Sequence, residues 1–381
     1  MYQTTVKRVS LPEGRRVFAV SDIHGGLTPL RQAMDQAGFS KDDILFVVGD
    51  YAERGLENLA VFREIMGLCQ THRVYPLMGN TDLSRLEWLS EGGRQAAQEF
   101  WDTSVRLRDY YGSGLLWDMC RETGMTLTSA EELEAAIPAL RQHFQPELSF
   151  LQNLATIIET EQYIFVHGGL PHERLDEFSG MSAWPYLKND AFIDKGVCFD
   201  KWLVVGHWPV ALYRSDRYCH APFVSEKQHI LGIDGGFGVK RDGQVNLVEL
   251  SPKGGQPKAV YSADVLPKVV ALDHQEPQAG TVFISWVTRQ VEVSERKGSF
   301  ALIRHLHSGR QLWVSEAFLY QDSGGDCCQD YSDELLAVEP GDVLSLIFSA
   351  DGEALVKKGS VIGRYLGRVD RYEDTKIRRF L

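Results

Sequence analysis

The sequence predicts an α/β domain followed by a small all-β domain. In the first two-thirds of the chain, short runs rich in Val, Ile, Phe and Leu each end in Gly or Asp, which is typical of buried strands. Between the first three of these runs lie segments with apolar residues at helical spacing. From about residue 268 the pattern changes to short strand-like runs with turns between them. These three observations predict two domains with separate cores.

Length and composition support two domains and exclude several classes of protein. The chain has 381 residues, 44% of them hydrophobic, and a formal net charge of −12. This length suffices for two cores. The acidic balance without a basic patch argues against nucleic acid as a partner. The chain has no run of 18 apolar residues, so we expect no transmembrane helix and no membrane partner.

The start of the sequence and its cysteines indicate a compartment. The first residues, MYQTTVKRVSLPEG, lack the apolar stretch of a signal peptide. The 6 cysteines show no C-x-x-C spacing and no dense framework, so we interpret them as free thiols in a reducing environment. The sequence therefore predicts a cytoplasmic protein.

Residues 15–83 predict a β-α-β-α-β beginning. The strand runs are VFAV (17–20), ILFVV (44–48) and VYPLM (74–78). Between them, residues 30–37 carry an apolar stripe that Gly38 closes, and residues 56–69 carry a second one. Alternation of this kind predicts parallel strands with helices packed against them.

Residues 84–160 predict a helical insertion. Aromatic side chains lie there among charges, with few strand signals, and Thr128 to Glu132 is typical of a helix N-terminus. Such an insertion forms either a wall of an active site or a packing cap on the sheet. The sequence favours the two interpretations equally.

Residues 161–250 return to strands, with YIFV (163–166), WLVV (202–205) and HILGI (229–233). The Asp242-Gly243 pair predicts a hairpin between residues 238–240 and 245–250. Residues 253–267 predict a linker, which divides the chain into domains 1–252 and 268–381. We expect the second to be a small SH3-like domain or barrel that binds a protein partner or the chain's own catalytic face.

Side chains able to bind metal follow the strand runs of the first domain. They are Asp22, His24, Asp50, Asn80, His167 and His207. Because α/β architectures form sites at the carboxyl ends of strands, we expect these side chains to share one site. Carboxylates, an amide and imidazoles in this number suggest two metals. Asp22 and His24, two residues apart in an extended segment, would face the same metal.

The order of these motifs resembles that of the calcineurin-like metallophosphoesterases of the phosphoprotein-phosphatase type. The motifs are Asp22-Ile23-His24-Gly25, Gly49-Asp50 through Arg54-Gly55, Gly79-Asn80, His167-Gly168-Gly169 and Gly206-His207. Five elements in order are far more specific than any one alone. The resemblance covers about residues 15–250. It implies a β-sandwich flanked by helices, of the kind found in bacterial serine/threonine phosphatases and symmetrical diadenosine tetraphosphatases.

The resemblance also implies a dinuclear centre that holds Mn, Fe or Zn. Asp50 would bridge the two ions, with Asp22 and His24 on the first and the other ligands on the second. Such ions lower the pKa of a shared water and supply a hydroxide for in-line attack on a phosphoryl group. Arg54 would grip two phosphate oxygens, assisted by Asn80. The plainer interpretation of Arg54 is a surface salt bridge.

One position departs from the family pattern. Thr81 stands where the family has the histidine that protonates the leaving group, and loss of a general acid costs about 10²–10⁴ in rate. A substitute acid is one interpretation, with Asp82, Glu53 and His172 as candidates. A substrate whose leaving group needs little protonation is the second. A retired catalyst that binds a phosphorylated partner is the third.

Two further assignments concern residues near the ligands. The family's second phosphate-binding arginine has Arg174 and Lys188 as possible counterparts, and the sequence does not decide between them. Asp234, in the Asp234-Gly235-Gly236 turn, is interpreted as a hydrogen-bond partner that supports His207.

The sequence thus predicts a metal-dependent phosphatase of the serine/threonine phosphoprotein type. The alternative is hydrolysis of dinucleoside tetraphosphates, because Trp208 after Gly206-His207 looks like the bacterial tetraphosphatases. A phosphate-binding scaffold, impaired as an enzyme by Thr81, is the remaining alternative.

Overall fold

A computed structural model describes residues 2–280, 282–350 and 352–372. The chain divides into two compact units, Met1–Val210 with Ala221–Asp264, and Ala211–His220 with Val265–Leu381. Residues 373–381, the end of the predicted second domain, lie outside the described part of the chain. No helix among the described residues is long and apolar enough to cross a membrane.

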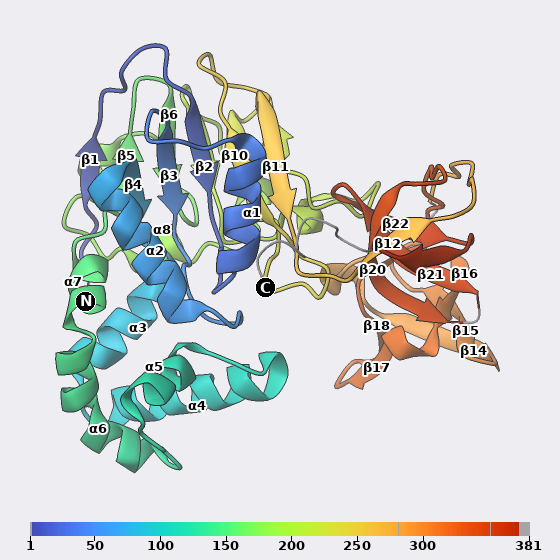
Figure 1. The fold of residues 1–381 in the computed structure, drawn as a ribbon, viewed down its shortest axis with the longest axis horizontal. Helices are drawn as coiled ribbons and strands as arrows, with labels where there is room; N and C mark the ends of the chain where they lie inside the picture. The colour runs from blue at the N-terminus through green and yellow to red at the C-terminus, as the bar shows by residue number, and fades with distance from the viewer. Residues whose placement is uncertain (1, 281, 351, 373–381) are drawn as a thin grey trace. The chain divides into compact units, whose positions relative to one another are not determined.

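The first unit contains two sheets with helices around them (Figure 1). The strand order of one sheet is β11-β10-β2-β3-β4, comprising Ala259–Ala263, Val245–Glu249, Val17–Val20, Ile44–Val48 and Arg73–Leu77. The order of the other is β1-β5-β6-β7-β9-β8, comprising Val6–Arg8, Ile157–Glu159, Tyr163–Val166, Trp202–Val205, Ile230–Gly232 and Phe223–Ser225. Strands β2, β3 and β4 are parallel, as are β6, β7 and β9. All six predicted strand runs are confirmed.

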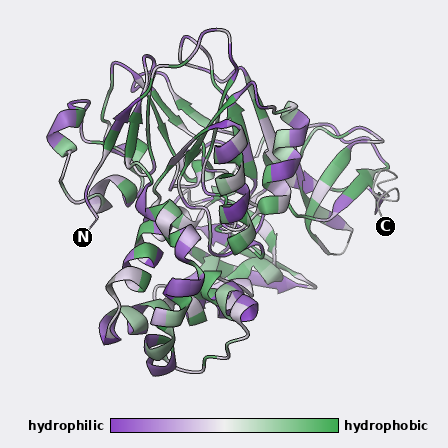
Figure 2. Cartoon of the chain, turned by 60° about the vertical axis from the view of Figure 1, so that its left-hand side comes forward, coloured by the Kyte–Doolittle hydropathy of each residue, from purple (hydrophilic) through white to green (hydrophobic). Residues whose placement is uncertain are grey.

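The two sheets pack face to face because their strands alternate between two apolar surfaces. In β3, Phe46 belongs to a core shared with the second sheet, whereas Leu45 belongs to the core beneath the helices. The rings of Phe46 and Phe165 stack with centroids 3.8 Å apart across that shared core. Both faces of β3 are therefore buried, which explains its unbroken apolar run. Hydrophobic residues make up much of these strands (Figure 2).

Helices cover the first sheet and form the insertion. They are α1 (Leu27–Ala37), α2 (Asn58–Thr71), α3 (Asn80–Glu91), α4 (Arg94–Tyr111), α5 (Leu115–Thr123), α6 (Ala130–His143), α7 (Gln145–Gln152) and the short α8 (Trp184–Leu187). Helix α1 buries the predicted stripe and ends at Gly38, whose φ of 55° is left-handed. The Ser129 hydroxyl caps α6 by accepting from the backbone N–H of Glu132. The predicted helical insertion is confirmed, and it begins at Asn80 rather than at residue 84.

Short 3₁₀ helices complete the connections. They are η1 (Leu175–Phe178), η2 (Phe192–Lys195), η3 (Val210–Tyr213), η4 (Trp286–Thr288) and η5 (Glu316–Phe318).

Two predictions about residues 238–267 are wrong. Residues 238–240 form a turn rather than a strand, and β10 pairs with β2 on one side and β11 on the other. The Asp242-Gly243 pair favours only a local turn. Pairing with β2 and β11 buries both faces of β10, which stabilises the strand more than a local hairpin would. Residues 259–263, predicted as linker, are strand β11 of that sheet. The Gly-rich segment before them is thus the turn of a β10–β11 hairpin.

The second unit is built from short antiparallel strands. One sheet has the order β22-β21-β20-β12-β23, comprising Val361–Tyr365, Glu353–Lys358, Val343–Ala350, Lys268–Ala271 and Val369–Arg371. A second sheet has the order β14-β15-β16, comprising Val291–Lys297, Phe300–His305 and Gln311–Ser315. Two-stranded pairs are β13-β19 and β17-β18, comprising Phe283–Ile284, Tyr331–Ser332, Leu319–Asp322 and Gly325–Cys328. An SH3-like or barrel architecture for this unit stays a prediction.

Candidate metal centre

The predicted ligands lie in loops at the carboxyl ends of parallel strands in both sheets of the first unit. Asp22 and His24 follow β2, and Asp50 follows β3. Asn80 follows β4 and begins α3. The remaining two, His167 and His207, follow β6 and β7 of the other sheet. The structure brings all six together, as their contacts show.

Asp22, His24 and Asp50 form the tightest group. One ligand atom from each lies within 4.8 Å of the others, and all three residues are buried. The Nε2 atom of His24 lies 3.8 Å from Asp22 Oδ1 and 3.7 Å from Asp50 Oδ2. These separations exceed a hydrogen bond and suit several ligands around one cation. The predicted extended geometry is wrong, because Asp22 and His24 have φ of 51° and 46°; a turn brings them together instead.

Two imidazoles are oriented by main-chain carbonyls. His24 Nδ1 lies 3.1 Å from the Ala52 carbonyl oxygen, and His167 Nδ1 lies 2.7 Å from that of Val48. A carbonyl oxygen can only accept, so each Nδ1 carries a proton, and in the neutral ring Nε2 turns its lone pair toward the site. This is the tautomer that a metal ligand requires, fixed by a second hydrogen bond.

The remaining ligands join the group across the two sheets. His167 Nε2 lies 3.1 Å from Asn80 Oδ1 and 3.5 Å from Asp50 Oδ1. The backbone N–H of His207 donates to Asp22 Oδ2 at 3.0 Å. The rings of His167 and His207 are 5.3 Å apart. Asp50 therefore faces a histidine from each side, His24 at Oδ2 and His167 at Oδ1.

The electrostatics of the group reflect its concentrated negative charge. Burial raises the pKa of Asp22 to about 6. Burial opposes ionisation of Asp50 too, but His167, His24 and Arg54 together hold the pKa of Asp50 well below its usual range. Burial likewise opposes protonation of His167, yet Asp50 and Asp22 raise its pKa to about 10. His167 thus acts as the counter-charge to two carboxylates, a role that bound cations would take over.

Strained backbone marks the same residues. Asp22, His24, Asp50 and His207 all have positive φ, between 46° and 68°. Left-handed conformations are uncommon outside glycine and cluster at functional sites. Neighbouring glycines make room for them. A Cβ on Gly79 would overlap Asp50 Oδ1, so only glycine allows that approach.

Asp82 and Glu53, the predicted substitute acids, are both tied to the loops around the site. The Asp82 carboxylate accepts backbone N–H groups from Asp50 at 2.7 Å, Tyr51 at 3.1 Å and Gly79 at 2.9 Å. Burial together with Asp50 raises its pKa to about 7. These bonds occupy both oxygens of Asp82 and hold the Asp50 loop against the start of α3.

Glu53 and Arg54 continue the second motif, both with left-handed backbone. Glu53 is 1% exposed and forms an ion pair with Arg85. The guanidinium of Arg54 donates to His24 Nε2 at 2.6 Å. Arg54 therefore points at the ligand group rather than at a surface acid, which supports the predicted phosphate role over the salt bridge.

Thr81 offers the site no acid. Its backbone N–H donates to Asp50 Oδ1 at 2.9 Å from the first turn of α3. Its hydroxyl is buried without a hydrogen-bond partner. His172, the remaining predicted acid, lies 3.4 Å from Glu177 and stacks on Phe178, so it is engaged elsewhere.

The sequence does not assign Asp190, and it does not decide between Lys188 and Arg174. His207 Nε2 lies 2.7 Å from Asp190 Oδ1 and 3.4 Å from Lys188 Nζ. Lys188 is thus at the site, whereas Arg174 pairs with Glu177. Asp190 lies in a loop without periodicity, and no sequence signal could have assigned it.

The surroundings of Asp234 show whether the predicted ligand residues fit a cation. One of its oxygens accepts from the Gly236 N–H at 2.7 Å, and the other is buried without a hydrogen-bond partner. Within the described residues Asp234 therefore makes no bond to His207, and that prediction is wrong: His207 Nε2 contacts Asp190 instead. Burial and then Asp22 raise the pKa of Asp234. An orphaned buried carboxylate oxygen is costly unless water or an ion meets it, so the residues present fit a metal site.

The sequence pattern of the calcineurin-like phosphoesterases matches residues 15–235, more than half of the 381-residue chain. This range begins just before β2 and ends at the turn after β9, so it contains all six predicted ligands. The chain therefore belongs to the calcineurin-like phosphoesterase family.

Individual relatives are distant. A symmetrical bis(5'-nucleosyl)-tetraphosphatase of Legionella pneumophila is 28% identical over 153 residues, covering 33% of this chain and 53% of that protein. The serine/threonine-protein phosphatase PP1-1 of Saccharomyces cerevisiae is 25% identical over 187 residues, covering 48% and 55%. The chain spans about half the length of these curated relatives. A solved serine/threonine phosphatase from Saccharomyces cerevisiae, 12% identical, covers 70% of this chain and 86% of its own with a TM-score of 0.40.

Proposed function

We propose that this chain is a metal-dependent phosphoesterase that hydrolyses phosphoserine or phosphothreonine in proteins. One observation carries the proposal: buried carboxylates from one sheet and imidazoles from both sheets converge, with the Nε2 atoms of His24 and His167 facing the carboxylate oxygens of Asp50. That donor set suits Mn, Fe or Zn. Family membership supports a phosphoric ester or anhydride as the substrate.

The six ligands divide into two sets around Asp50. Asp22 and His24 would hold one ion together with Asp50, because the three are mutually close. Asn80, His167 and His207 would hold the second, and Asp50 Oδ1 faces His167. Bound cations would supply Lewis-acid polarisation of a phosphoryl oxygen and activation of water. Asp82 holds Asp50 in place through the backbone of its loop.

Two cationic side chains are placed to bind the phosphoryl group. Arg54 reaches His24, and its planar fork matches two phosphate oxygens. Lys188 reaches His207 on the other flank, where Asp190 now pairs with it. Together they would offset the charge of a phosphate dianion and hold it in line for attack. Asn80 can donate from its amide nitrogen to the same group while its oxygen faces the metal set.

Protonation of the leaving group is the step for which the predicted acids are poorly placed. Thr81 has only a hydroxyl, both oxygens of Asp82 accept backbone N–H groups, and Glu53 is held by Arg85. Substrates with acidic leaving groups are therefore turned over fastest. The same observation favours a second candidate function, hydrolysis of dinucleoside tetraphosphates, because a nucleotide leaves without needing a strong acid. One relative bears a tetraphosphatase name.

The deciding experiment measures p-nitrophenyl phosphate hydrolysis by the metal-stripped full chain, with and without Mn²⁺. Asp50→Asn is compared with Asp102→Asn, an exposed aspartate on α4. We expect turnover that depends on metal and is abolished only in Asp50→Asn. A phosphoserine peptide and diadenosine tetraphosphate then separate the two candidate functions. Absence of turnover with both substrates, while elemental analysis shows bound metal, would instead identify a phosphate-binding scaffold.

A further inference from the structure

Strand β16 forms one edge of the three-stranded sheet in the second unit. Bonded and non-bonded pairs alternate along an antiparallel ladder. The His305 N–H donates to the Arg310 carbonyl at 2.8 Å, and the Glu316 N–H donates to the Ser299 carbonyl at 2.9 Å. These two bonds fix the phase of the ladder between β15 and β16. They place Gln311 and Trp313 among the non-bonded pairs.

The main-chain groups of Gln311 and Trp313 therefore point away from β15. Within the described residues, neither forms a main-chain hydrogen bond to another strand. Each offers one N–H and one C=O at the open edge. Residues two apart on one strand present their groups in the same direction, so the edge is a template for an added strand.

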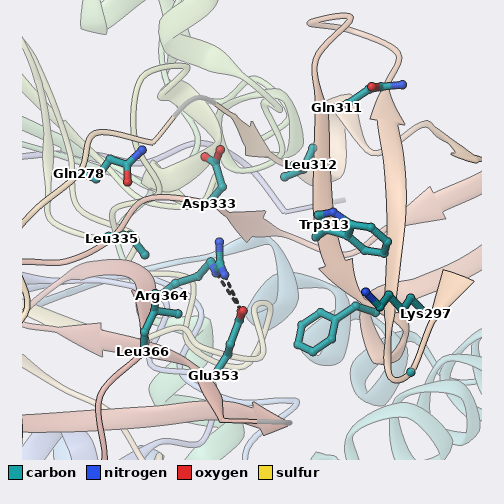
Figure 3. Close-up of a pocket in the computed structure, with 12 residues that line it drawn as sticks. Gln278, Lys297, Gln311, Leu312, Trp313, Asp333, Leu335, Glu353, Arg364 and Leu366 are labelled. Carbon is teal, nitrogen blue, oxygen red and sulfur yellow. Dashed lines mark hydrogen bonds and ion pairs between the residues drawn. The ribbon is translucent and has the colours of Figure 1, made fainter. Parts of the chain in front are cut away.

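A groove of about 720 Å³ runs beside this edge. Trp313 and Lys297 lie on one side of it, and Arg364, Asp333 and Leu335 lie on the other (Figure 3). The groove thus has a wall opposite the open edge.

The edge lacks the features that usually protect one. Natural edge strands carry lysine, proline or a bulge that blocks further pairing. The sequence of β16, Gln-Leu-Trp-Val-Ser, has no charged residue and no proline, and its pairing with β15 shows no register shift. Trp313 is 38% exposed, a large apolar side chain left beside unpaired main-chain groups. An edge without these features can pair with an added strand.

The charges of the groove indicate what that segment carries. Two acids line the groove, and both are already engaged. Glu353 is paired with Arg364 through contacts of 3.1 and 2.6 Å, and Asp333 accepts the backbone N–H of Val282 at 2.9 Å. Lys297, at the end of β14, is exposed and has no ion pair among the described residues. An acidic side chain on the bound segment would pair with it.

We propose that this groove binds an extended, acidic peptide segment of a partner protein, which adds to the sheet as a fourth strand beside β16. Main-chain hydrogen bonds to Gln311 and Trp313 supply affinity, while an apolar residue against Trp313 and an acidic one near Lys297 supply selectivity. The proposal does not depend on the activity of the first unit.

Selection from a display library of random heptapeptides, with the full chain as target, tests the proposal. We expect enriched peptides that alternate an apolar residue with other residues and contain Asp or Glu. Synthetic versions are then N-methylated at one amide at a time. Because alternate amides of a paired strand face β16, methylation at every second position should weaken binding about tenfold and methylation between them should not. If methylation weakens binding without this two-residue periodicity, the proposal is wrong.

Matched variants locate the peptide on the protein. Gln311→Pro removes an outward N–H and no bond to β15, whereas Gln311→Ala removes only the side chain. Binding should fall about tenfold in the first and persist in the second. Lys297→Glu should weaken acidic peptides, and Lys227→Glu, an exposed site in the first unit, should not. Circular dichroism confirms that each variant folds; if Gln311→Pro does not, the N-methyl series decides.

Other occupants give different results. If sedimentation shows a dimer of the wild type that Gln311→Pro converts to a monomer, a second copy of the chain covers the edge and the proposal is wrong. If the selected peptides bind Gln311→Pro as well as Gln311→Ala, they occupy another surface, and the proposal is wrong as well.

Discussion

Arg85 of helix α3 and Glu53 of the second motif form a buried ion pair, with Arg85 Nε donating to Glu53 Oε1 at 2.8 Å. Glu53 also accepts the backbone N–H of Leu115, the first residue of α5, at 3.2 Å. The helical insertion is therefore connected to the turn that carries Arg54. Of the two interpretations of the insertion, this connection favours a wall of the site over a cap on the sheet.

We predict that Arg85→Met destabilises the first unit strongly, because removing one partner leaves the Glu53 charge buried and unpaired. The expected loss is about 3–5 kcal/mol, measured by urea unfolding. The double variant Arg85→Met with Glu53→Gln should recover part of that loss. An equal loss in the single and double variants would show that the pair is not coupled.

We predict a steep dependence of rate on the leaving group, because Thr81 supplies no acid. Turnover of p-nitrophenyl phosphate should exceed that of a phosphoserine peptide by about 10²–10⁴. Thr81→His should raise the phosphoserine rate selectively, and Thr81→Ala should leave both rates unchanged, since the hydroxyl makes no hydrogen bond. A wild-type enzyme insensitive to the leaving group would mean that another residue donates the proton.

We predict that Lys188→Ala raises KM for phosphorylated substrates by roughly tenfold to hundredfold, the effect of losing one charge-assisted hydrogen bond. Arg174→Ala is the matched control, because Arg174 pairs with Glu177 instead of facing His207. Steady-state kinetics on the metal-loaded protein provides the comparison. Similar effects of the two substitutions would remove Lys188 from the phosphate-binding set.

We predict that Gly79→Ala lowers metal content, since a Cβ there would displace Asp50 Oδ1. Gly67→Ala is the control: it lies in the exposed part of α2 with nothing within 4 Å of an added Cβ, and it should stabilise the helix by about 1 kcal/mol. Elemental analysis after dialysis against limiting Mn²⁺ measures the difference. Full occupancy in Gly79→Ala would place the metals away from Asp50.

The sequence correctly predicts that the loops with the six candidate ligands lie together, because each loop follows an apolar strand run and parallel strands end at one edge of a sheet. It fails where a local signal competes with a distant partner. The Asp242-Gly243 turn indicates a hairpin, but β10 pairs with β2, which lies more than 200 residues earlier. Asp190 and Lys188 lie in a loop whose path is set by tertiary contacts. Neither hydrophobic periodicity nor motif spacing in the sequence could therefore place them at the site.

The left-handed backbone at Asp22, His24, Asp50 and His207 restricts the chemistry open to this site. Among residues with a side chain, aspartate, asparagine and histidine tolerate this conformation best, and they are also oxygen and nitrogen ligands. A different metal would require other ligands at these positions. Longer or β-branched side chains there would destabilise the left-handed turns. The path of the main chain therefore narrows the metals that evolution or design can readily reach from this scaffold.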